Sequence, residues 1–426
     1  MKLTMYIFIT NRMIDRIIIN CFFIFSIING LNAQVNEIKK NSTTNIKRTY
    51  RFDQLPNNGL YTIELENISA DIKIIGENGL GAKILISQLF FDIPEKDLQE
   101  IHKLAKTIVT YLENQQLIRI SGHLNNNINS IQQTIELRLP NNINLNFDLL
   151  GGDIELKNIN GESIIKTGGG DIIINNYYGN IEAKTDGGDV SINMLDGILK
   201  SHTFGGYTKL SKSKGELSLS SIGGDIDMFE LIGNINCQSS GGSVSLINIK
   251  GNRINCQSSG GSIEGNDLKG NITFYSSGEK INLSEIEGNI ELESSGGLIR
   301  IENSKGSVKC KTSSGNIEMF DITGNIESLN SSGDILLDFL YDSSIENNSI
   351  YMETHSGNIS INIPKGLPSN IESTIYQTTS IKNLNSEIPL NIITAENKVI
   401  GTRVIDSGTI PIKLKVHHGI ITIKES

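Results

Sequence analysis

The sequence predicts an all-β protein: a single-stranded parallel β-helix, or β-solenoid, with 18-residue coils and right-handed winding. A glycine corner recurs at a fixed interval, and alternating aliphatic residues fill each interval. Composition agrees, because 42 of the 426 residues are Gly, none is Trp and 6% are aromatic. A core with so few rings must be aliphatic, and the abundant Ile favours strands.

The glycine corners set the period. We number each coil from the residue that follows a Gly-Gly, Ser-Gly or similar corner and call it position 0. Every step between these residues is 18, except one of 19 in which Arg253 is interpreted as an insertion. Glycine suits such corners because it adopts positive φ without steric cost. Position 0 is occupied by Asp153, Asp171, Asp189, Tyr207, Asp225, Ser243, Ser262, Lys280, Leu298, Asn316 and Asp334.

Within each coil, apolar residues alternate with polar ones. Positions 1 and 3 are apolar in most coils, as in Ile154 and Leu156, and positions 10 and 12 begin a second such segment, as in Ile290 and Leu292. A spacing of two predicts strands with alternate side chains inward. The constant repeat favours pairing with the same strand of the next coil. Left-handed hexapeptide helices, calcium β-rolls and leucine-rich repeats do not fit these positions, which leaves a right-handed or flattened parallel β-helix.

Residues 1–33 are predicted to be a signal peptide. Arg12 and Arg16 precede an apolar run that ends before the small residue Ala33. The run is too short to span a bilayer stably, and polar sequence follows it, so removal is expected rather than anchoring. We therefore expect an exported protein in the periplasm, on the cell surface or outside the cell.

The rest of the chain divides into three segments. Residues 34–145 lack the period, show strand patterns and contain one expected helix near 94–106 that begins at Pro94. Residues 146–345 hold the regular coils, and residues 346–426 hold the final coils and a C-terminal cap. Because the end of a solenoid exposes unpaired strand edges, both outer segments are predicted to be caps.

The charge of the chain limits the classes of partner that it is expected to bind. The formal net charge is −10, and acidic residues are spread along the chain rather than gathered in blocks. Nucleic acid is not expected as a partner, because phosphate binding needs a basic face. After residue 33 no apolar run approaches membrane-spanning length, so no membrane span is expected. We expect a monomer that binds a protein or polysaccharide surface ligand.

Three stretches carry a resemblance to a known family. Thr-Ile-Glu-Leu-Arg-Leu-Pro at 134–140 leads into Gly-Gly-Asp-Ile-Glu-Leu-Lys-Asn-Ile-Asn-Gly at 151–161, and Gly-Ile-Ile-Thr-Ile-Lys at 419–424 closes the chain. Over roughly residues 50–426 the sequence resembles a bacterial β-helix domain of unknown function that carries the label putative adhesin. The resemblance implies a secreted or surface-associated binding role, and it supplies no catalytic residues.

The alternative of an enzyme requires several reactive side chains close together on one face. Glycan-cleaving sites require carboxylates, Lys or Arg on neighbouring coils, and sugar sites usually have exposed aromatics. Trp is absent, and Arg253 and Arg300, the arginines of the regular coils, lie more than two coils apart. Of the six histidines, the adjacent His417 and His418 should face opposite sides of a strand and chelate poorly. We expect no catalytic residues and no cofactor.

Two ladders have structural interpretations. Cys237 and Cys256 share one inward position in consecutive coils, about 4.8 Å apart, which permits a disulfide. Parallel side chains would strain such a bridge, so small core residues are favoured, with the disulfide left open. Asparagines at position 9 are interpreted as turn residues with positive φ and stacked amides. They are Asn180, Asn234, Asn252, Asn271, Asn289 and Asn325.

Asp153, Asp171 and Asp189 form a carboxylate ladder at position 0 of three consecutive coils. Like charges about 4.8 Å apart repel, so something must offset the repulsion. The favoured hypothesis is that each carboxylate accepts backbone N–H bonds at its Gly-Gly corner. The alternative is a bridging Ca²⁺, although Ca²⁺ wants six or more oxygens and further donors are not evident.

The functional expectation is a non-enzymatic binding or adhesion-type protein of the bacterial envelope or surface. A structural envelope scaffold is the first alternative, and a carbohydrate-active enzyme on a β-helix fold is the second. The sequence names no ligand.

Overall fold

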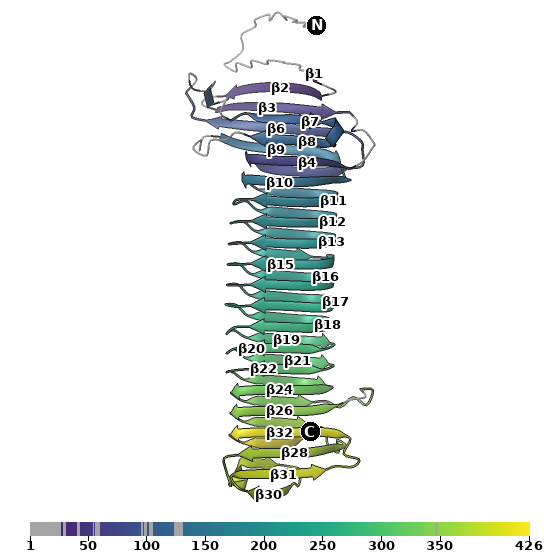
Figure 1. Cartoon of the computed structure of the whole chain (residues 1–426), viewed down its shortest axis with the longest axis vertical. Coiled ribbons are helices and arrows are strands. Elements are labelled where there is room, and N and C mark those ends of the chain that lie inside the picture. The colour runs from purple at the N-terminus through teal and green to yellow at the C-terminus, as the bar shows by residue number, and fades with distance from the viewer. Residues whose placement is uncertain are drawn as a thin grey trace, which may run out of the picture.

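The computed structural model is a long all-β rod, which confirms the predicted class (Figure 1). The predicted signal peptide lies mostly outside the residues that the structure describes, and so does most of the helix expected near 94–106. No helix within the described part is long and apolar enough to cross a membrane. The structure describes residues 27–28, 31–40, 43–53, 55, 60–94, 97, 100–101, 105–122, 131–345 and 348–426.

The N-terminal end mixes antiparallel and parallel pairing. Its elements are β1 (Ile27–Ile28), β2 (Leu31–Lys40), β3 (Thr43–Phe52), β4 (Tyr61–Ser69), β5 (Asp71–Glu77), β6 (Ala82–Phe91), β7 (Thr107–Leu112), η1 (Glu113–Gln115), β8 (Leu117–Gly122), β9 (Ile131–Pro140) and β10 (Ile143–Gly151). β2, β3, β6 and β9 pair antiparallel in that order. β4 and β5 instead pair in parallel with β10 and the strand after it, so the first coil stacks on this end.

The middle of the rod is a parallel stack. Its strands are β11 (Ile154–Thr167), β12 (Ile172–Thr185), β13 (Val190–Thr203), β14 (Thr208–Ser211), β15 (Lys214–Ser221), β16 (Ile226–Ser239), β17 (Val244–Ser258), β18 (Ile263–Ser276), β19 (Ile281–Glu287), β20 (Ile290–Ser294), β21 (Ile299–Lys305), β22 (Val308–Thr312), β23 (Ile317–Thr323), β24 (Asn325–Ser332) and β25 (Ile335–Phe339). Ile154 pairs with Ile172, and Ile172 pairs with Val190, each one repeat further on. These stacked aliphatic side chains are fully buried and form a continuous core.

The coils that begin at Asp153 through Asn316 bend sharply at position 5. Asn158, Asn176, Asn248 and Asn303 have φ between 53° and 59°, the left-handed region, and Met194 and Glu230 occupy the same place in other coils. The bend shifts the inward alternation by one residue, so Leu156 and Ile159 are both buried although they are three residues apart. A second bend falls at position 8, where Gly179 has φ 121° and a Cβ would lie 2.2 Å from the Gly161 oxygen. Only glycine fits there.

The interpretation of the position-9 asparagines is therefore wrong in one respect. Asn180 and Asn289 are not among the residues with positive φ, because position 5 and the preceding glycine absorb both bends. Stacked amides do occur, since Asn289 Nδ2 donates to Asn271 Oδ1 at 2.9 Å.

The interpretation of Arg253 as the inserted residue is also wrong. It pairs with Asn271, and the register shift falls between Gly251 and Arg253, so Asn252 is the extra residue.

The favoured interpretation of the stacked cysteines is also wrong. Cys237 and Cys256 form a disulfide between consecutive coils, with Cα atoms 4.7 Å apart. Their strands pair in parallel with the two cysteines in register, which brings the sulfurs together. Cys310 is a free, buried thiol, and burial raises its pKa to about 12.

The C-terminal end leaves the repeat and returns to it. Its elements are β26 (Ser349–Ser356), β27 (Ile359–Ile363), β28 (Ser369–Tyr376), η2 (Ile381–Asn383), β29 (Leu384–Ser386), β30 (Asn391–Ala395), β31 (Lys398–Val404), β32 (Ile410–His418) and β33 (Ile421–Glu425). β26 and β27 pair in parallel with β32 and β33. The excursion between them adds β28 beside β32, followed by antiparallel β31 and β30, which cover the end of the rod (Figure 1).

Candidate functional site

A mostly uncharged polar surface runs over the middle of the rod, and we call it the polar face. It consists of the outward residues at positions 9, 11 and 13 of β15 to β18. Their inward neighbours, such as Leu217 and Ile235, are buried, so alternation forces these side chains outward. All twelve are exposed or half-exposed. They are Glu216, Ser218, Ser220, Asn234, Asn236, Gln238, Arg253, Asn255, Gln257, Asn271, Thr273 and Tyr275.

The polar face is a regular grid. Ser218 pairs with Asn236, and Asn236 pairs with Asn255, so like groups lie side by side on neighbouring strands. Spacing is about 4.8 Å across strands and about 7 Å between successive outward residues. Ten of the twelve side chains are amides, hydroxyls or the Tyr275 phenol, and the charged Glu216 and Arg253 both lie in the position-9 row. The sequence analysis did not identify this face, because it considered charged side chains on neighbouring coils and not uncharged polar ones. The available signal was the run of Asn, Gln, Ser and Thr at positions 11 and 13.

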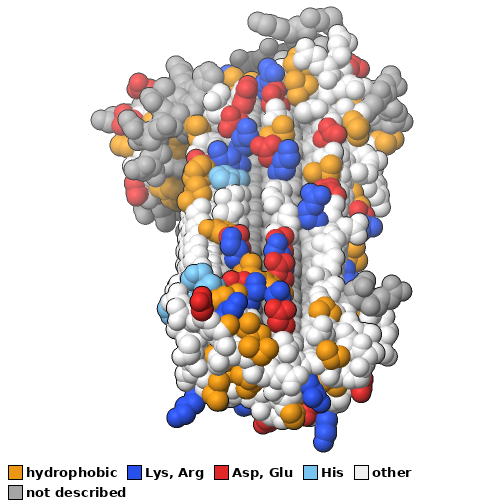
Figure 2. Space-filling model, turned by 60° about the horizontal axis from the view of Figure 1, so that its bottom comes forward, with side chains coloured by type: hydrophobic (Ala, Val, Ile, Leu, Met, Phe, Trp, Pro, Cys, Tyr) orange, Lys and Arg blue, Asp and Glu red, His pale blue; other side chains and the backbone are white. Residues whose placement is uncertain are grey.

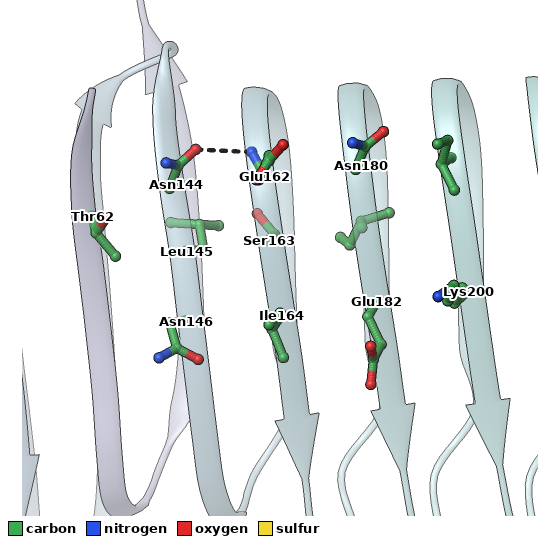
Figure 3. A pocket seen from close by; sticks show the side chains of 12 residues that line it. Thr62, Asn144, Leu145, Asn146, Glu162, Ser163, Ile164, Asn180, Glu182 and Lys200 are labelled. Atoms are coloured by element: carbon green, nitrogen blue, oxygen red, sulfur yellow. Dashed lines mark hydrogen bonds between the residues drawn. The ribbon is translucent and has the colours of Figure 1, made fainter. Parts of the chain in front are cut away.

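At its N-terminal end the polar face continues into a shallow hollow of about 530 Å³ over β4 and β10 to β13. Figure 3 shows Asn146, Ile164, Glu182 and Lys200 in a row across neighbouring strands. The Asn144 amide oxygen accepts the backbone N–H of Glu162 at 2.9 Å. The hollow therefore combines exposed Ile with amide and charged groups.

A buried tyrosine supports the floor of the hollow. Ser163 occupies an inward position that most coils give to a larger aliphatic residue, and Tyr177, from the next coil, is fully buried. The Tyr177 hydroxyl lies 2.7 Å from Ser163 Oγ and donates to the Gly161 oxygen at 2.9 Å. Burial raises the pKa of Tyr177 to about 12, so the phenol stays neutral as a structural donor.

Beside the hollow, an exposed aromatic ring meets two basic side chains. His202 packs edge-on against Phe204, with ring centroids 4.7 Å apart. Lys184 Nζ lies 5.2 Å from the centre of the same ring, a cation–π distance. Phe204 is 42% exposed, so its ring remains accessible to a ligand.

Ion pairs replace amides beyond β18. Lys309 Nζ lies 3.5 Å from Glu291, and Lys311 Nζ lies 3.4 Å from Glu293. Both pairs are exposed, and such pairs contribute little stability. They mark the C-terminal boundary of the polar face. The Arg300 guanidinium is likewise paired, with Glu302 and Glu318, on a different side of the coil.

The carboxylate ladder at position 0 is hydrogen-bonded between coils. Asp153 Oδ1 accepts the N–H of Asp171 at 2.9 Å, and Asp171 Oδ1 accepts the N–H of Asp189 at 2.8 Å. The donor belongs to the next coil rather than to the residue's own corner, because parallel stacking places it one strand spacing away. The ladder also extends to Asp71, whose carboxylate accepts the N–H of Asp153. The Ca²⁺ hypothesis for this ladder stays a prediction.

A second ladder, of buried hydroxyls, was not predicted. At position 14, Thr185 Oγ1 donates to the Gly170 oxygen at 2.8 Å and accepts the Gly188 N–H at 3.2 Å. Each such hydroxyl ties a glycine corner to the corner of the preceding coil. The signal was a Thr or Ser three residues before the second corner glycine. Members that donate to a corner carbonyl are Thr167, Thr185, Thr203, Ser221, Ser239 and Ser258.

Comparison with known proteins identifies the family to which the sequence is similar. The family model described as Toastrack DUF4097 matches residues 62–424, which confirms the resemblance to a domain of unknown function. A crystal structure described as a putative cell adhesion protein from Clostridium sporogenes is 9% identical, and the match covers 93% of this chain and 100% of that chain. Its TM-score of 0.16 supports no inference. No curated protein matches the chain.

Proposed function

Because the chain belongs to the Toastrack DUF4097 family, a family of repeat-built β domains, we propose that it is an exported, non-enzymatic, adhesion-type binding protein of the bacterial envelope or surface. Its ligand is a hydroxyl-rich polymer, best matched by a polysaccharide. The polar face carries the proposal. Right-handed winding, a monomeric state and an export signal in residues 1–33 belong to the same proposal.

The chemistry of the polar face suits a neutral polymer. Amides and hydroxyls both donate and accept hydrogen bonds, as sugar hydroxyls do. A regular grid lets a repeating ligand make the same contacts in several successive coils. The many weak hydrogen bonds along its length then together raise the overall affinity. Tyr275 on the face and Phe204 beside the hollow offer rings that can pack against the apolar faces of sugars.

Binding to isolated polysaccharides tests the proposal. We expect the purified protein to bind at least one of a glycan array, peptidoglycan sacculi or capsular polysaccharide. Changing Asn255 and Gln257 together to Glu should weaken binding at least about tenfold, because buried charges at an interface need partners. Asn266→Glu on another side of the rod is the matched control and should bind normally. No glycan binding, or equal binding by both variants, contradicts the proposal.

The two alternatives have separate measurements. A structural scaffold predicts end-to-end polymers in sedimentation velocity, whereas a binding protein stays monomeric. A carbohydrate-active enzyme predicts release of reducing ends from the bound glycan over time. Fractionation with surface proteolysis places the protein in the periplasm, on the surface or in the medium.

A further inference from the structure

Three strands far apart in the sequence meet at the C-terminal end of the rod. β26, β32 and β28 are neighbours, in that order. Their outward side chains align in rows. Glu353 lies opposite Lys415, and Ile375 lies opposite Val416, the residue before His417. Figure 2 shows pale-blue histidine side chains beside acidic and basic ones on this end of the molecule. Sequence spacing could not reveal this cluster, because its members lie in separate segments.

The cluster brings two imidazoles and one carboxylate together. Ligand atoms of Glu353, His355 and His417 all lie within 4.8 Å of one another. His417 Nε2 is 3.3 Å from Glu353 Oε1, and the two imidazole rings stack with centroids 4.0 Å apart. A tetrahedral Zn²⁺ with bonds of about 2.0–2.2 Å places its ligand atoms roughly 3.4 Å apart. Imidazole binds a metal in the plane of its ring, so His355 must turn out of the ring stack to reach the ion, and its exposure leaves room for that rotation.

The surroundings orient the ligand atoms. Tyr351 donates to Glu353 Oε2, and Lys415 Nζ lies 3.9 Å from that same oxygen, which leaves Oε1 directed toward His417. Tyr376 stacks on the His417 ring with centroids 4.7 Å apart.

We propose that Glu353, His355 and His417 form a surface site for Zn²⁺, with a fourth coordination position open to solvent. Imidazole ligands favour Zn²⁺ and related transition metals over Ca²⁺ and Mg²⁺, which prefer all-oxygen sites. The bound ion joins β26 to β32, the two strands between which the chain makes its C-terminal excursion. Metal binding therefore fastens β32, which follows the excursion, to β26, which precedes it. This inference is independent of the polymer-binding proposal.

Isothermal titration of the tag-free protein with ZnCl₂ tests the site. We expect one site per chain, and His355→Gln and His417→Gln should each weaken binding at least about tenfold. His418→Gln, next to a ligand but exposed, and His202→Gln, far from the site in β13, are matched controls and should bind as the wild type does. Absence of a Zn²⁺ site in the wild type, or equal weakening by His355→Gln and His418→Gln, overturns the proposal.

A second readout separates a built site from loss of fold. His355 is exposed, so His355→Gln should keep the circular dichroism spectrum and the melting temperature of the metal-free protein. Zn²⁺ at about 100 times its Kd should raise the apparent melting temperature of the wild type by roughly 3 °C through mass action. The rise should disappear in His355→Gln and persist in His418→Gln. A rise of equal size in all three proteins contradicts the assignment.

Discussion

The middle and the ends of the rod both consist of β-strands, but the strands find their partners in different ways. In the middle each strand lies against the strand one repeat further on, as Ile172 lies against Val190. At the ends, partners come from distant segments, since Ile72 pairs with Ile154 and Ile350 pairs with Ile412. The middle is therefore close to a one-dimensional stack of equivalent contacts, whereas each end depends on one particular set of long-range pairs.

The difference also separates the two candidate sites. The polar face arises from repetition, because the same positions in four successive coils carry similar side chains. The Glu353, His355 and His417 cluster arises from a single return of the chain at the C-terminal end. Repetition suits an extended ligand, and a unique crossing suits a point ligand such as an ion. Four changes to the chain test how far the two regions differ.

Removing an end should have the largest effect. Deletion of residues 34–140 removes β4 and β5, which cover the edges of β10 and β11. Exposed parallel strand edges recruit other chains, so the truncated protein should aggregate or form fibres. Size-exclusion chromatography and electron microscopy measure this outcome. A soluble monomer after the deletion would show that the coils cap themselves and would weaken the distinction drawn here.

Breaking the core of the middle should have the next largest effect. Ile290 is 2% exposed between Ile272 and Val308, while the neighbouring Glu291 points to solvent. Ile290→Asp buries an unpaired carboxylate and should destabilise the protein by on the order of 4–5 kcal/mol. Glu291→Ala loses an exposed ion pair and should stay within about 0.5 kcal/mol of the wild type. Urea unfolding of both variants measures the contrast, and equal midpoints would contradict the assigned inward face.

Removing one rung of the hydroxyl ladder should have an intermediate effect. Thr185 is fully buried and bonded to Gly170 and Gly188, so Thr185→Val should cost about 1–3 kcal/mol by leaving those backbone groups without it. Thr208 is equally buried, but within the described structure its hydroxyl has no partner. Thr208→Val is the matched control and should be neutral or stabilising. Equal losses in urea unfolding would mean that volume, rather than hydrogen bonding, decides stability at these positions.

The sequence revealed those parts of the fold that repeat. Period and alternation identified the inward residues, such as Ile290 and Leu292, because burial follows directly from a spacing of two. Stacking also brought Cys237 and Cys256 into register, although side-chain direction alone argued against the bond that they form. Long-range pairs could not be predicted, because nothing in the spacing of His355 and His417 indicates that β26 meets β32. The position-5 bend was missed because Asn, Asp, Met, Lys and Glu all occupy it.

The smallest effect is expected at the carboxylate ladder, where the protein supplies its own comparison. Asn316 occupies position 0 in a later coil, and its Oδ1 accepts the N–H of Asp334 at 3.0 Å, in the same way that Asp171 accepts the N–H of Asp189. An amide oxygen therefore replaces the carboxylate oxygen without loss of the hydrogen bond. Asp171→Asn also removes the middle one of three like charges about 4.8 Å apart.

If hydrogen bonding is the whole role of the ladder, Asp171→Asn should change stability by less than about 0.5 kcal/mol. Thermal melts of the wild type should then be identical in calcium and in chelator. If Ca²⁺ bridges the ladder instead, calcium should raise the melting temperature of the wild type, and Asp171→Asn should abolish that rise because it removes a charged oxygen ligand. Asp225→Asn, on the far side of the break at Tyr207, is the control. A calcium-dependent rise that survives Asp171→Asn but not Asp225→Asn would place the ion in a different part of the rod.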